Sequence, residues 1–340
     1  MTGQDVSTQL VPGVDPALND RLVAGLEAVQ HRLHQVVDHE DEFIAGASRY
    51  LSDAGGKRFR PMLTLLAAEV GRSPMDGTTA SAAVVDAAVG VELTHLASLY
   101  HDDVMDEAEL RRGIPSANVA FDNSTSILVG DLLFGTASKI ISGLGAEAVG
   151  IQADTFVRLC AGQIRDDRPV PAGVDPVDHY LGVLADKTGA LIATAARYGA
   201  MFAGCDGDTV DLLTEYGEKV GMVFQLADDL LDIASDSADS GKTPGTDLRE
   251  GKATLPVLIA RTSTDPADER LTQLLAGPIP DEAELQEALE LLRAHPAMDA
   301  ARAHTLRVAD EARATLAPLP DGPAVQALRV LVDGVALRSS

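Results

Sequence analysis

The chain has 340 residues, two cysteines and a formal net charge of −25, and 46% of its residues are hydrophobic while only 4% are aromatic. This composition excludes wholesale disorder, because there is ample apolar surface to form a core. The charge disfavours nucleic acid and anionic lipid as partners, because both are negatively charged themselves.

Proline positions predict where the helices lie. Long stretches rich in Ala and Leu contain no proline and have apolar residues at helical spacing, namely residues 17–60, 75–114, 116–168 and 177–243. No segment shows the alternation that is typical of a strand. The sequence therefore predicts an all-α fold with about ten or more helices and no sheet. We expect a flexible segment over residues 1–17 and a single large helical bundle domain over residues 18–340, around a central cavity.

The most apolar stretch, Ala82–Tyr100, carries Asp86, Glu92 and His95. It is better interpreted as a long buried helix than as a membrane span, because a span has few ionisable groups. Residues 1–18 contain no Lys or Arg and no apolar core, so they do not resemble a signal peptide. Two cysteines cannot form a disulfide framework, and we expect Cys160 and Cys205 to be buried thiols in a cytoplasmic protein.

Two acidic segments share one pattern, Asp102–Asp106 and Asp228–Asp232. Each places two aspartates four residues apart, on the same face of a helix, where like charges repel. A solvated acidic surface is the simplest interpretation of one such segment. The pattern occurs twice, however, and each time at the end of an apolar helix, where carboxylates are costly unless they are paired or bound to metal. The two segments together predict Mg²⁺ binding, because this cation prefers oxygen ligands.

Basic residues are scarce, so their positions are informative. The segment Gly55–Pro61 has three cations behind two glycines, and the pair Arg111-Arg112 follows the first acidic segment. Isolated lysines occur at Lys187, Lys242 and Lys252. Each could be a surface cation, but together with the aspartates they describe a pocket for two phosphorylated ligands, one bridged by Mg²⁺ and one held by Arg and Lys. No P-loop is present, and the strands that a kinase or Rossmann site needs are not predicted.

At these positions the sequence resembles the trans-type isoprenyl diphosphate synthases, or polyprenyl synthetases. The matching segments, in that family's order and spacing, are Gly55–Pro61, Asp102–Asp106, Arg111–Gly113, Lys187-Thr188, Phe224–Asp232, Lys242 and Gly251-Lys252. The resemblance covers about residues 20–338. It implies the all-α isoprenoid synthase fold, a homodimer, and Mg²⁺-dependent head-to-tail condensation of an allylic diphosphate with isopentenyl diphosphate. It further implies about three Mg²⁺ ions when substrate is bound.

Carried over by position, the resemblance implies roles for individual residues. Mg²⁺ would be held by Asp102, Asp106 and Asp228, with Asp103 and Asp232 as supporting carboxylates that act as ligands or through water. The allylic diphosphate would be bound by Arg111, Lys187 and Lys242, with Lys252 nearby. The diphosphate of isopentenyl diphosphate would be bound by Gly56, Lys57, Arg60, His95 and Arg112. Thr188 and Gln225 would face the reacting carbons, and Gln163 would contact metal through water. Tyr100 and His101 would support the aspartates.

The implied chemistry needs no side-chain nucleophile. The allylic C–O bond breaks, cations stabilise the charge that grows on the diphosphate, and the isopentenyl double bond attacks the allylic cation before a proton is lost. Ala97 and Ser98 precede the first aspartate by about one turn and are small, as are Thr94 and Gly90 further back. The family relates an aromatic residue there to short products. We therefore expect a product of geranylgeranyl length or longer, with heptaprenyl to nonaprenyl favoured, and transient membrane contact for its release.

Three alternatives remain at this point. A class I terpene cyclase shares the all-α core but lacks the Gly55–Pro61 segment and has a different second metal motif. A subunit that only shapes the pocket of a heteromeric synthase would lose aspartates, whereas this chain retains both sets. An acidic helical scaffold would have no turnover.

Overall fold

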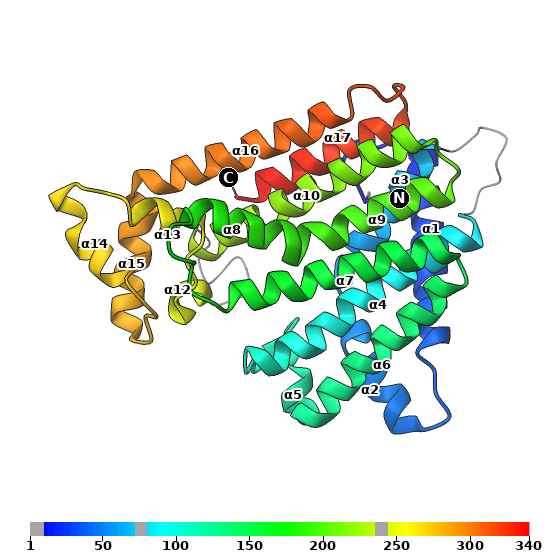
Figure 1. Ribbon diagram of the computed structural model, residues 1–340, viewed down its shortest axis with the longest axis horizontal. Helices are drawn as coiled ribbons and strands as arrows, with labels where there is room; N and C mark the ends of the chain where they lie inside the picture. The colour runs from blue at the N-terminus through cyan, green and yellow to red at the C-terminus, as the bar shows by residue number, and fades with distance from the viewer. Residues whose placement is uncertain (1–9, 72–79, 235–243, 340) are drawn as a thin grey trace, which may run out of the picture. The chain divides into compact units, whose positions relative to one another are not determined.

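The computed structural model describes residues 10–71, 80–234 and 244–339, and it is almost entirely helical (Figure 1). The helices in chain order are α1 (Pro16–Val36), α2 (Glu42–Asp53), α3 (Phe59–Val70), α4 (Ala82–Met105), α5 (Ala117–Ala120), α6 (Asn123–Ser142), α7 (Ala146–Asp166), α8 (Pro176–Leu184), α9 (Ala190–Phe202), α10 (Gly207–Ala234), α12 (Thr246–Glu250), α13 (Leu255–Ala260), α14 (Glu269–Leu274), α15 (Glu282–Ala294), α16 (Pro296–Thr315) and α17 (Pro323–Ala336). Three further segments are single turns. The turn η1 (Ala185–Gly189) is π-helical, whereas η2 (Pro266–Asp268) and η3 (Leu337–Ser339) are 3-10 helical. The predicted all-α class is confirmed.

The helices form two compact units. The first contains Met1–Phe156, Leu191–Gly217 and Leu316–Val330, and the second contains Val157–Ala190, Glu218–Thr315 and Leu331–Ser340. Four helices, α7, α9, α10 and α17, contribute residues to both units. The predicted single domain over residues 18–340 stays a prediction, and most of the predicted flexible segment, residues 1–9, lies outside the described residues.

Helix α4 is the core of the first unit. The Ser81 hydroxyl caps it by accepting a hydrogen bond from the amide of Val84 at 3.2 Å. The helix packs against α1, α3 and α6, and its middle is buried on more than one face. Tyr100 fixes its far end, because its buried hydroxyl donates to the carbonyl of Ala47 and accepts from the amide of Leu51. The long buried helix predicted over Ala82–Tyr100 is confirmed, and it extends to Met105.

Two helices, α4 and α6, are long and apolar enough to cross a membrane by length and composition alone. The apolar window of α4 is 61% buried within the protein, as expected of a core helix. The window of α6 is only 39% buried, so this helix presents apolar side chains on the surface.

The segment after α4 departs from the prediction of no sheet. Strands β1 (Leu110–Arg111) and β2 (Ile114–Pro115) pair antiparallel, and a two-residue turn joins them. Both turn residues have positive φ, +56° at Arg112 and +79° at Gly113, which is the geometry that a tight hairpin turn requires. The pairing is too short to produce an alternating pattern, so the sequence periodicity could not have shown it.

Gly199 in α9 tests the packing of the first unit. An ideal Cβ there would lie 2.1 Å from the carbonyl oxygen of Thr64 in α3. We expect Gly199→Ala to lower the free energy of unfolding by about 1–3 kcal/mol, because the two backbones must move apart. Gly46→Ala in α2 is the matched control, since its Cβ would meet nothing within 4 Å. Equal melting temperatures for the two variants, measured by calorimetry, would contradict this packing.

Candidate active site

The first aspartate motif lies at the C-terminal end of α4. Asp102 is half-buried in the last turn, and Asp106 is the exposed residue that ends the helix, with its amide donating to the Asp102 carbonyl at 2.8 Å. The C-terminal end of a helix carries partial negative charge, so carboxylates there are disfavoured unless a cation is present. This donor set therefore fits a divalent cation.

Asp103 points elsewhere. It is completely buried, and one of its carboxylate oxygens accepts from Arg111 Nε at 2.6 Å while the other accepts from the amide of Ala117 at 3.0 Å. Both oxygens thus have partners within the protein, and the carboxylate links α4 to β1 and α5. The geometry gives Asp103 the task of holding Arg111 in place.

An arginine cluster lies beside the glycine loop of the first unit. Arg58, in a left-handed conformation, pairs with the buried Glu92 at 2.7 Å and donates to the carbonyl of Ser52. Arg112 donates to the carbonyls of Leu51, at 2.7 Å, and Gly55. These bonds fix the loop and leave Glu92 as the counter-ion that the cluster shares.

Gly56 is required by this arrangement. Its φ is +131°, and an ideal Cβ would lie 3.0 Å from the guanidinium carbon of Arg112. Any side chain would push Arg112 away from the loop, so the predicted ligand-binding position can only be glycine. Lys57, the next residue, is exposed at the surface of the loop.

Arg60 and His95 complete the cluster. Burial lowers the pKa of Arg60 to about 10, although Glu92 opposes the shift, and Arg60 Nε is buried without a hydrogen-bond partner. Burial and four neighbouring arginines hold the pKa of His95 well below its usual value. A buried donor without a partner beside an excess of positive charge indicates an anion site.

The second aspartate motif lies near the C-terminal end of α10, in the second unit. Asp229 is buried and accepts from the Tyr180 hydroxyl of α8 and from Gln225 Nε2 at 2.8 Å. The Thr188 hydroxyl of η1 donates to Gln225 Oε1 at 3.4 Å. The structure therefore joins the predicted residues Thr188 and Gln225 through one chain of hydrogen bonds that ends on Asp229.

Asp232 caps the next short helix, because its carboxylate accepts the amides of Thr246, at 3.2 Å, and Asp247, at 3.1 Å. Burial, together with the charges of Asp229 and Asp232, raises the pKa of Asp247 to about 7. Burial also raises the pKa of Asp229 to about 6. The neighbouring carboxylates add to this shift, whereas the hydrogen bonds of Asp229 oppose it. Crowded carboxylates of this kind are relieved by a divalent cation, so the second donor set also fits one.

Lys187 and Thr188 lie in the π-helical turn η1, where helices often carry functional side chains. Lys187 Nζ pairs with Asp166 at 2.6 Å. The turn is held from α7: Asp186 pairs with Arg158, at 2.8 Å, and with Arg165. An ideal Cβ on Gly162 would lie 2.7 Å from the amide nitrogen of Lys187, so α7 and η1 touch through their backbones.

The remaining predicted residues are placed as follows. Lys252 pairs with Glu250 at 2.7 Å, and Gln163 donates to Asp167 at 3.2 Å. His101 lies against α6, where its Nε2 contacts the carbonyl of Ile127 at 3.1 Å. Lys242 lies outside the described residues.

Ala97 is completely buried, and the half-buried Ser98 donates to the carbonyl of His95 at 2.8 Å. Neither lines the small cavity of the first unit, whereas Thr94 and Gly90, predicted further along the same path, both do.

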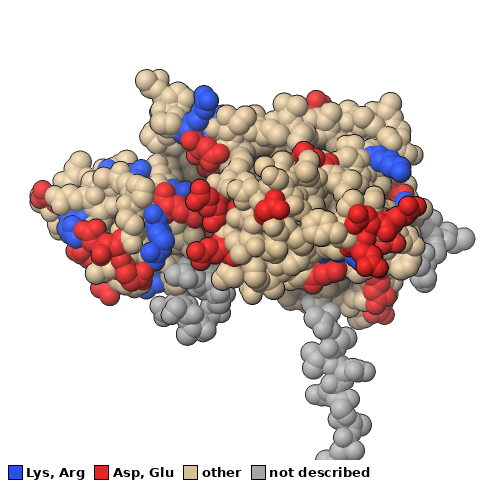
Figure 2. Space-filling model, turned by 90° about the horizontal axis from the view of Figure 1, so that it is seen from below, with Lys and Arg blue, Asp and Glu red and all other residues tan. Residues whose placement is uncertain are grey.

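Sequence reasoning missed four residues of the two clusters: Glu92 as the shared counter-ion, Tyr180, Asp186 and Asp247. Of these four, only Glu92 could have been noticed in the sequence, because it is an acid within the most apolar helix. Among the described residues, no group of three or more His, Cys, Asp or Glu side chains is preassembled as a metal site. Figure 2 shows that Asp and Glu dominate the visible charge on one face, with Lys and Arg in small groups.

The fold and the two clusters define an all-α protein that combines carboxylates suited to a divalent cation with arginines suited to an anion. The polyprenyl synthetase family matches residues 41–292. The nonaprenyl diphosphate synthase of Mycobacterium tuberculosis is 47% identical over 329 residues, which cover 95% of this chain and 96% of the relative.

Solved structures agree. The geranylgeranyl pyrophosphate synthase of Corynebacterium glutamicum, crystallised with calcium and isoprenyl diphosphate, has a TM-score of 0.84 at 43% identity, covering 95% of this chain and 98% of that one. The polyprenyl synthase of Caulobacter crescentus has a TM-score of 0.85 at 32% identity, with coverages of 94% and 98%. The chain belongs to the polyprenyl synthetase family and is a prenyltransferase.

Gly162 offers a test of how η1 is positioned. We expect Gly162→Ala to lower turnover by about tenfold or more, because an added Cβ displaces the backbone of Lys187 and Thr188 by an amount that catalysis does not tolerate. Gly150→Ala, on the same helix, is the control, since its Cβ would meet nothing within 4 Å. Steady-state rates of prenyl transfer that are equal in the two variants would contradict the account of η1.

Proposed function

We propose that this prenyltransferase condenses an allylic diphosphate with isopentenyl diphosphate and repeats the head-to-tail addition to give an all-trans polyprenyl diphosphate of geranylgeranyl length or longer. The observation that carries the proposal is the half-buried arginine cluster, in which Arg60 Nε is buried without a hydrogen-bond partner beside an excess of positive charge. In a chain whose net charge is −25, such a concentration of cations favours an anion as the ligand.

The arginine cluster suits isopentenyl diphosphate, which needs binding and orientation but no activation. In this proposal Arg60 and Arg112 provide the charge, Gly56 lets the diphosphate approach the backbone, and Lys57 closes the loop over it. Burial and the surrounding arginines hold the pKa of His95 well below its usual value, so His95 would add a hydrogen bond without adding charge.

The aspartate motifs suit the allylic diphosphate, whose C–O bond must break. We propose Asp102, Asp106 and Asp228 as ligands of Mg²⁺, about three ions in all, while Asp103 and Asp232 support them. When bound, Mg²⁺ neutralises the charge that grows on the leaving diphosphate. Arg111, Lys187 and Lys242 hold the same group, and Lys252 lies close by in the sequence. Substrate oxygens and water would complete the coordination, as is usual for Mg²⁺.

Thr188 and Gln225 are proposed to face the reacting carbons. Their hydrogen bond, and the bond from Gln225 to Asp229, orient both polar groups. The side-chain carbonyl oxygen of Gln225 would stabilise a nearby allylic cation without attacking it.

The long-chain product is supported by the small residues before Asp102 and by the relatives. One relative, 47% identical to this chain, is named a nonaprenyl diphosphate synthase, which favours the upper part of the expected range. We propose a cytoplasmic enzyme that contacts a membrane transiently to release so apolar a product.

We also propose a homodimer. Large apolar side chains are exposed to solvent in the single chain along two helices: Ile127, Leu128 and Leu132 on α6, and Val149, Phe156, Val157 and Ile164 on α7. Such a surface is typical of a protein–protein interface. Cys160 lies on the same side of α7 as Phe156 and Ile164, and it is exposed, so the prediction of a buried thiol is wrong for the single chain.

The metal assignment is tested by supplying Mg²⁺, an allylic diphosphate and labelled isopentenyl diphosphate. We expect Asp102→Ala and Asp228→Ala to lower kcat/KM by about 100-fold or more, because each removes charge stabilisation at the leaving group. Asp211→Ala, at an exposed position of α10, serves as the control and retains the normal rate. Near-normal rates in the first two variants would remove the assignment. Cyclic hydrocarbon as the product, or turnover only after a second kind of chain is added, would favour the cyclase or the subunit.

Product length is tested at Ala97. We expect Ala97→Phe to shorten the prenyl product, because the ring adds bulk at a completely buried position one turn before the first aspartate. Chain-length chromatography of the products is the measurement. An unchanged distribution of product chain lengths would contradict the hypothesis that this turn lines the path of the growing chain.

The homodimer is tested at Leu128, which is 66% exposed on α6. We expect Leu128→Glu to weaken association by about tenfold or more, because a charge would be buried in an apolar interface. Sedimentation velocity over a range of concentrations measures the effect. A monomeric wild-type protein at micromolar concentration would contradict the dimer.

A further inference from the structure

The helix that begins with α8 contains an inserted residue. The elements α8, η1 and α9 follow one another without a break, and the five residues of η1 form a π-helical turn. The amide of Ala190 donates to the carbonyl of Ala185, five residues earlier, whereas an α-helix would use the amide four residues on. An insertion of this kind changes which side chains share a face before and after the turn.

The insertion decides whether Tyr180 and Thr188 can both face α10. In an uninterrupted α-helix these two side chains, eight residues apart, would point about 80° away from each other. A π-helical turn advances by a smaller angle per residue, which removes most of this difference. In the structure the Tyr180 hydroxyl donates to Asp229, and the Thr188 hydroxyl donates to Gln225 Oε1 at 3.4 Å. The two acceptors lie four residues apart, on one face of α10.

Charged side chains stabilise the turn from α7 and α10. Arg158, Gly162 and Arg165 share one face of α7, because they are spaced by four and three residues. The carboxylate of Asp186 accepts from Arg158 Nε at 2.8 Å and also pairs with Arg165. The same Arg158 guanidinium donates to Glu218 of α10. Gly162 lies between the two arginines and lets the backbone of η1 approach α7.

The charges of this network balance, since two arginines face two acids. It therefore differs from the arginine cluster of the first unit, where Arg60 Nε is buried without a hydrogen-bond partner. A single exposed ion pair contributes little to stability. Here, however, Asp186 is only 20% exposed, and the planar guanidinium of Arg158 bonds acids of two different elements at once. Such an arrangement fixes geometry and leaves no surplus charge for a diphosphate.

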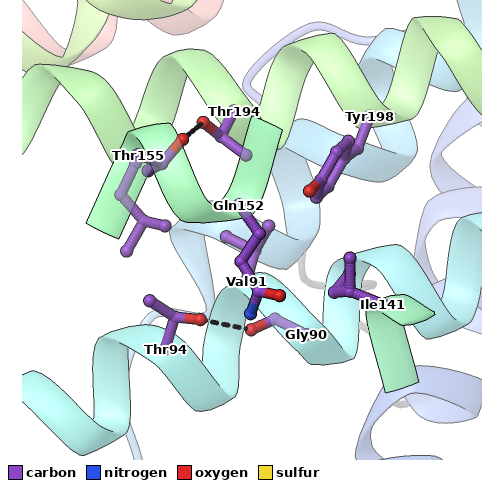
Figure 3. Close-up of a pocket in the computed structure, with 9 residues that line it drawn as sticks. Gly90, Val91, Thr94, Ile141, Gln152, Thr155, Thr194 and Tyr198 are labelled. Carbon is purple, nitrogen blue, oxygen red and sulfur yellow. Dashed lines mark hydrogen bonds between the residues drawn. The ribbon is translucent and has the colours of Figure 1, made fainter. Parts of the chain in front are cut away.

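The residues that follow the turn are held separately, in the first unit. The hydroxyls of Thr155 and Thr194 are hydrogen-bonded at 2.6 Å, and the Tyr198 hydroxyl donates to a backbone carbonyl of α7 at 2.7 Å (Figure 3). The helix is thus anchored at Tyr180 before the turn and at Thr194 and Tyr198 after it. A change of register must be taken up within η1.

We propose that Asp186 and Arg158 are positioning residues for prenyl transfer, which hold η1 in its π-helical form and thereby set the direction of Lys187 and Thr188. The inference rests on the proposed function, which assigns the allylic diphosphate to Lys187 and the reacting carbons to Thr188. Neither positioning residue lies in a segment that resembles the synthase motifs.

Two variants test the network. Asp186→Ala removes the carboxylate that two arginines share, and Arg158→Lys keeps the positive charge but loses the planar fork. We expect each to lower the single-turnover rate of the first condensation, at saturating isopentenyl diphosphate, by about tenfold or more, because Lys187 and Thr188 are displaced. The half-saturating concentration of isopentenyl diphosphate should stay within about twofold, since the arginine cluster proposed to bind it belongs to the first unit.

Asp178→Ala, which removes an exposed acid of α8, is the matched control and should retain both values. If Asp186→Ala does not fold, Arg158→Lys alone decides. A rate for Arg158→Lys equal to that of the control overturns the inference, as does a half-saturating concentration that rises as much as the rate falls. Absence of any prenyl transfer to isopentenyl diphosphate by the wild-type enzyme would instead overturn the proposed function.

Discussion

The structure depends on negative charge that is placed where a helix least tolerates it. Both aspartate motifs lie at the C-terminal ends of long helices, α4 and α10, where the backbone dipole is itself negative. In the second unit, burial and neighbouring carboxylates also raise the pKa of Asp229 and that of Asp247, so both effects oppose ionisation there. A divalent cation beside these carboxylates would offset that cost.

The arginine cluster has the opposite imbalance. Arg58, Arg60 and Arg112 lie near the buried Glu92, and their charges help to hold the pKa of His95 well below its usual value. One chain thus maintains two local deviations from its overall charge, each suited to a different diphosphate. The surface acidity opposes nucleic acid and acidic lipid, whereas under the proposed function the arginines and the bound Mg²⁺ would compensate the charge of the two diphosphates.

Much of this site could be predicted from the sequence, since its motifs are local. The four-residue spacing of Asp102 and Asp106 predicts one helical face, and in the structure Asp102 lies in the last turn of α4 with Asp106 at its C-cap. Asp103 shows the limit of such reasoning. It is adjacent to Asp102, yet it is completely buried and binds Arg111. Tyr180, Asp186 and Asp247 come from segments whose proximity depends on tertiary packing, which no local pattern records.

In the fold, too, features that depend on local sequence were predictable, whereas those that depend on tertiary packing were not. Proline spacing predicted the long helices, because proline interrupts a helix through local chemistry. The β1–β2 hairpin escaped notice because two residues cannot show periodicity. The exposed Cys160 was mispredicted because the sequence does not reveal which side of α7 faces away from the core of a single chain.

The most direct test of the account is a calorimetric binding measurement on the wild-type protein. Isopentenyl diphosphate and an allylic diphosphate analogue that cannot ionise are each titrated with Mg²⁺ and with EDTA. The account predicts that isopentenyl diphosphate binds equally in both conditions, because arginines hold it, whereas the allylic analogue loses its binding in EDTA. Loss of isopentenyl diphosphate binding in EDTA, or metal-independent binding of the allylic analogue, would contradict the assignment of carboxylates to one diphosphate and arginines to the other.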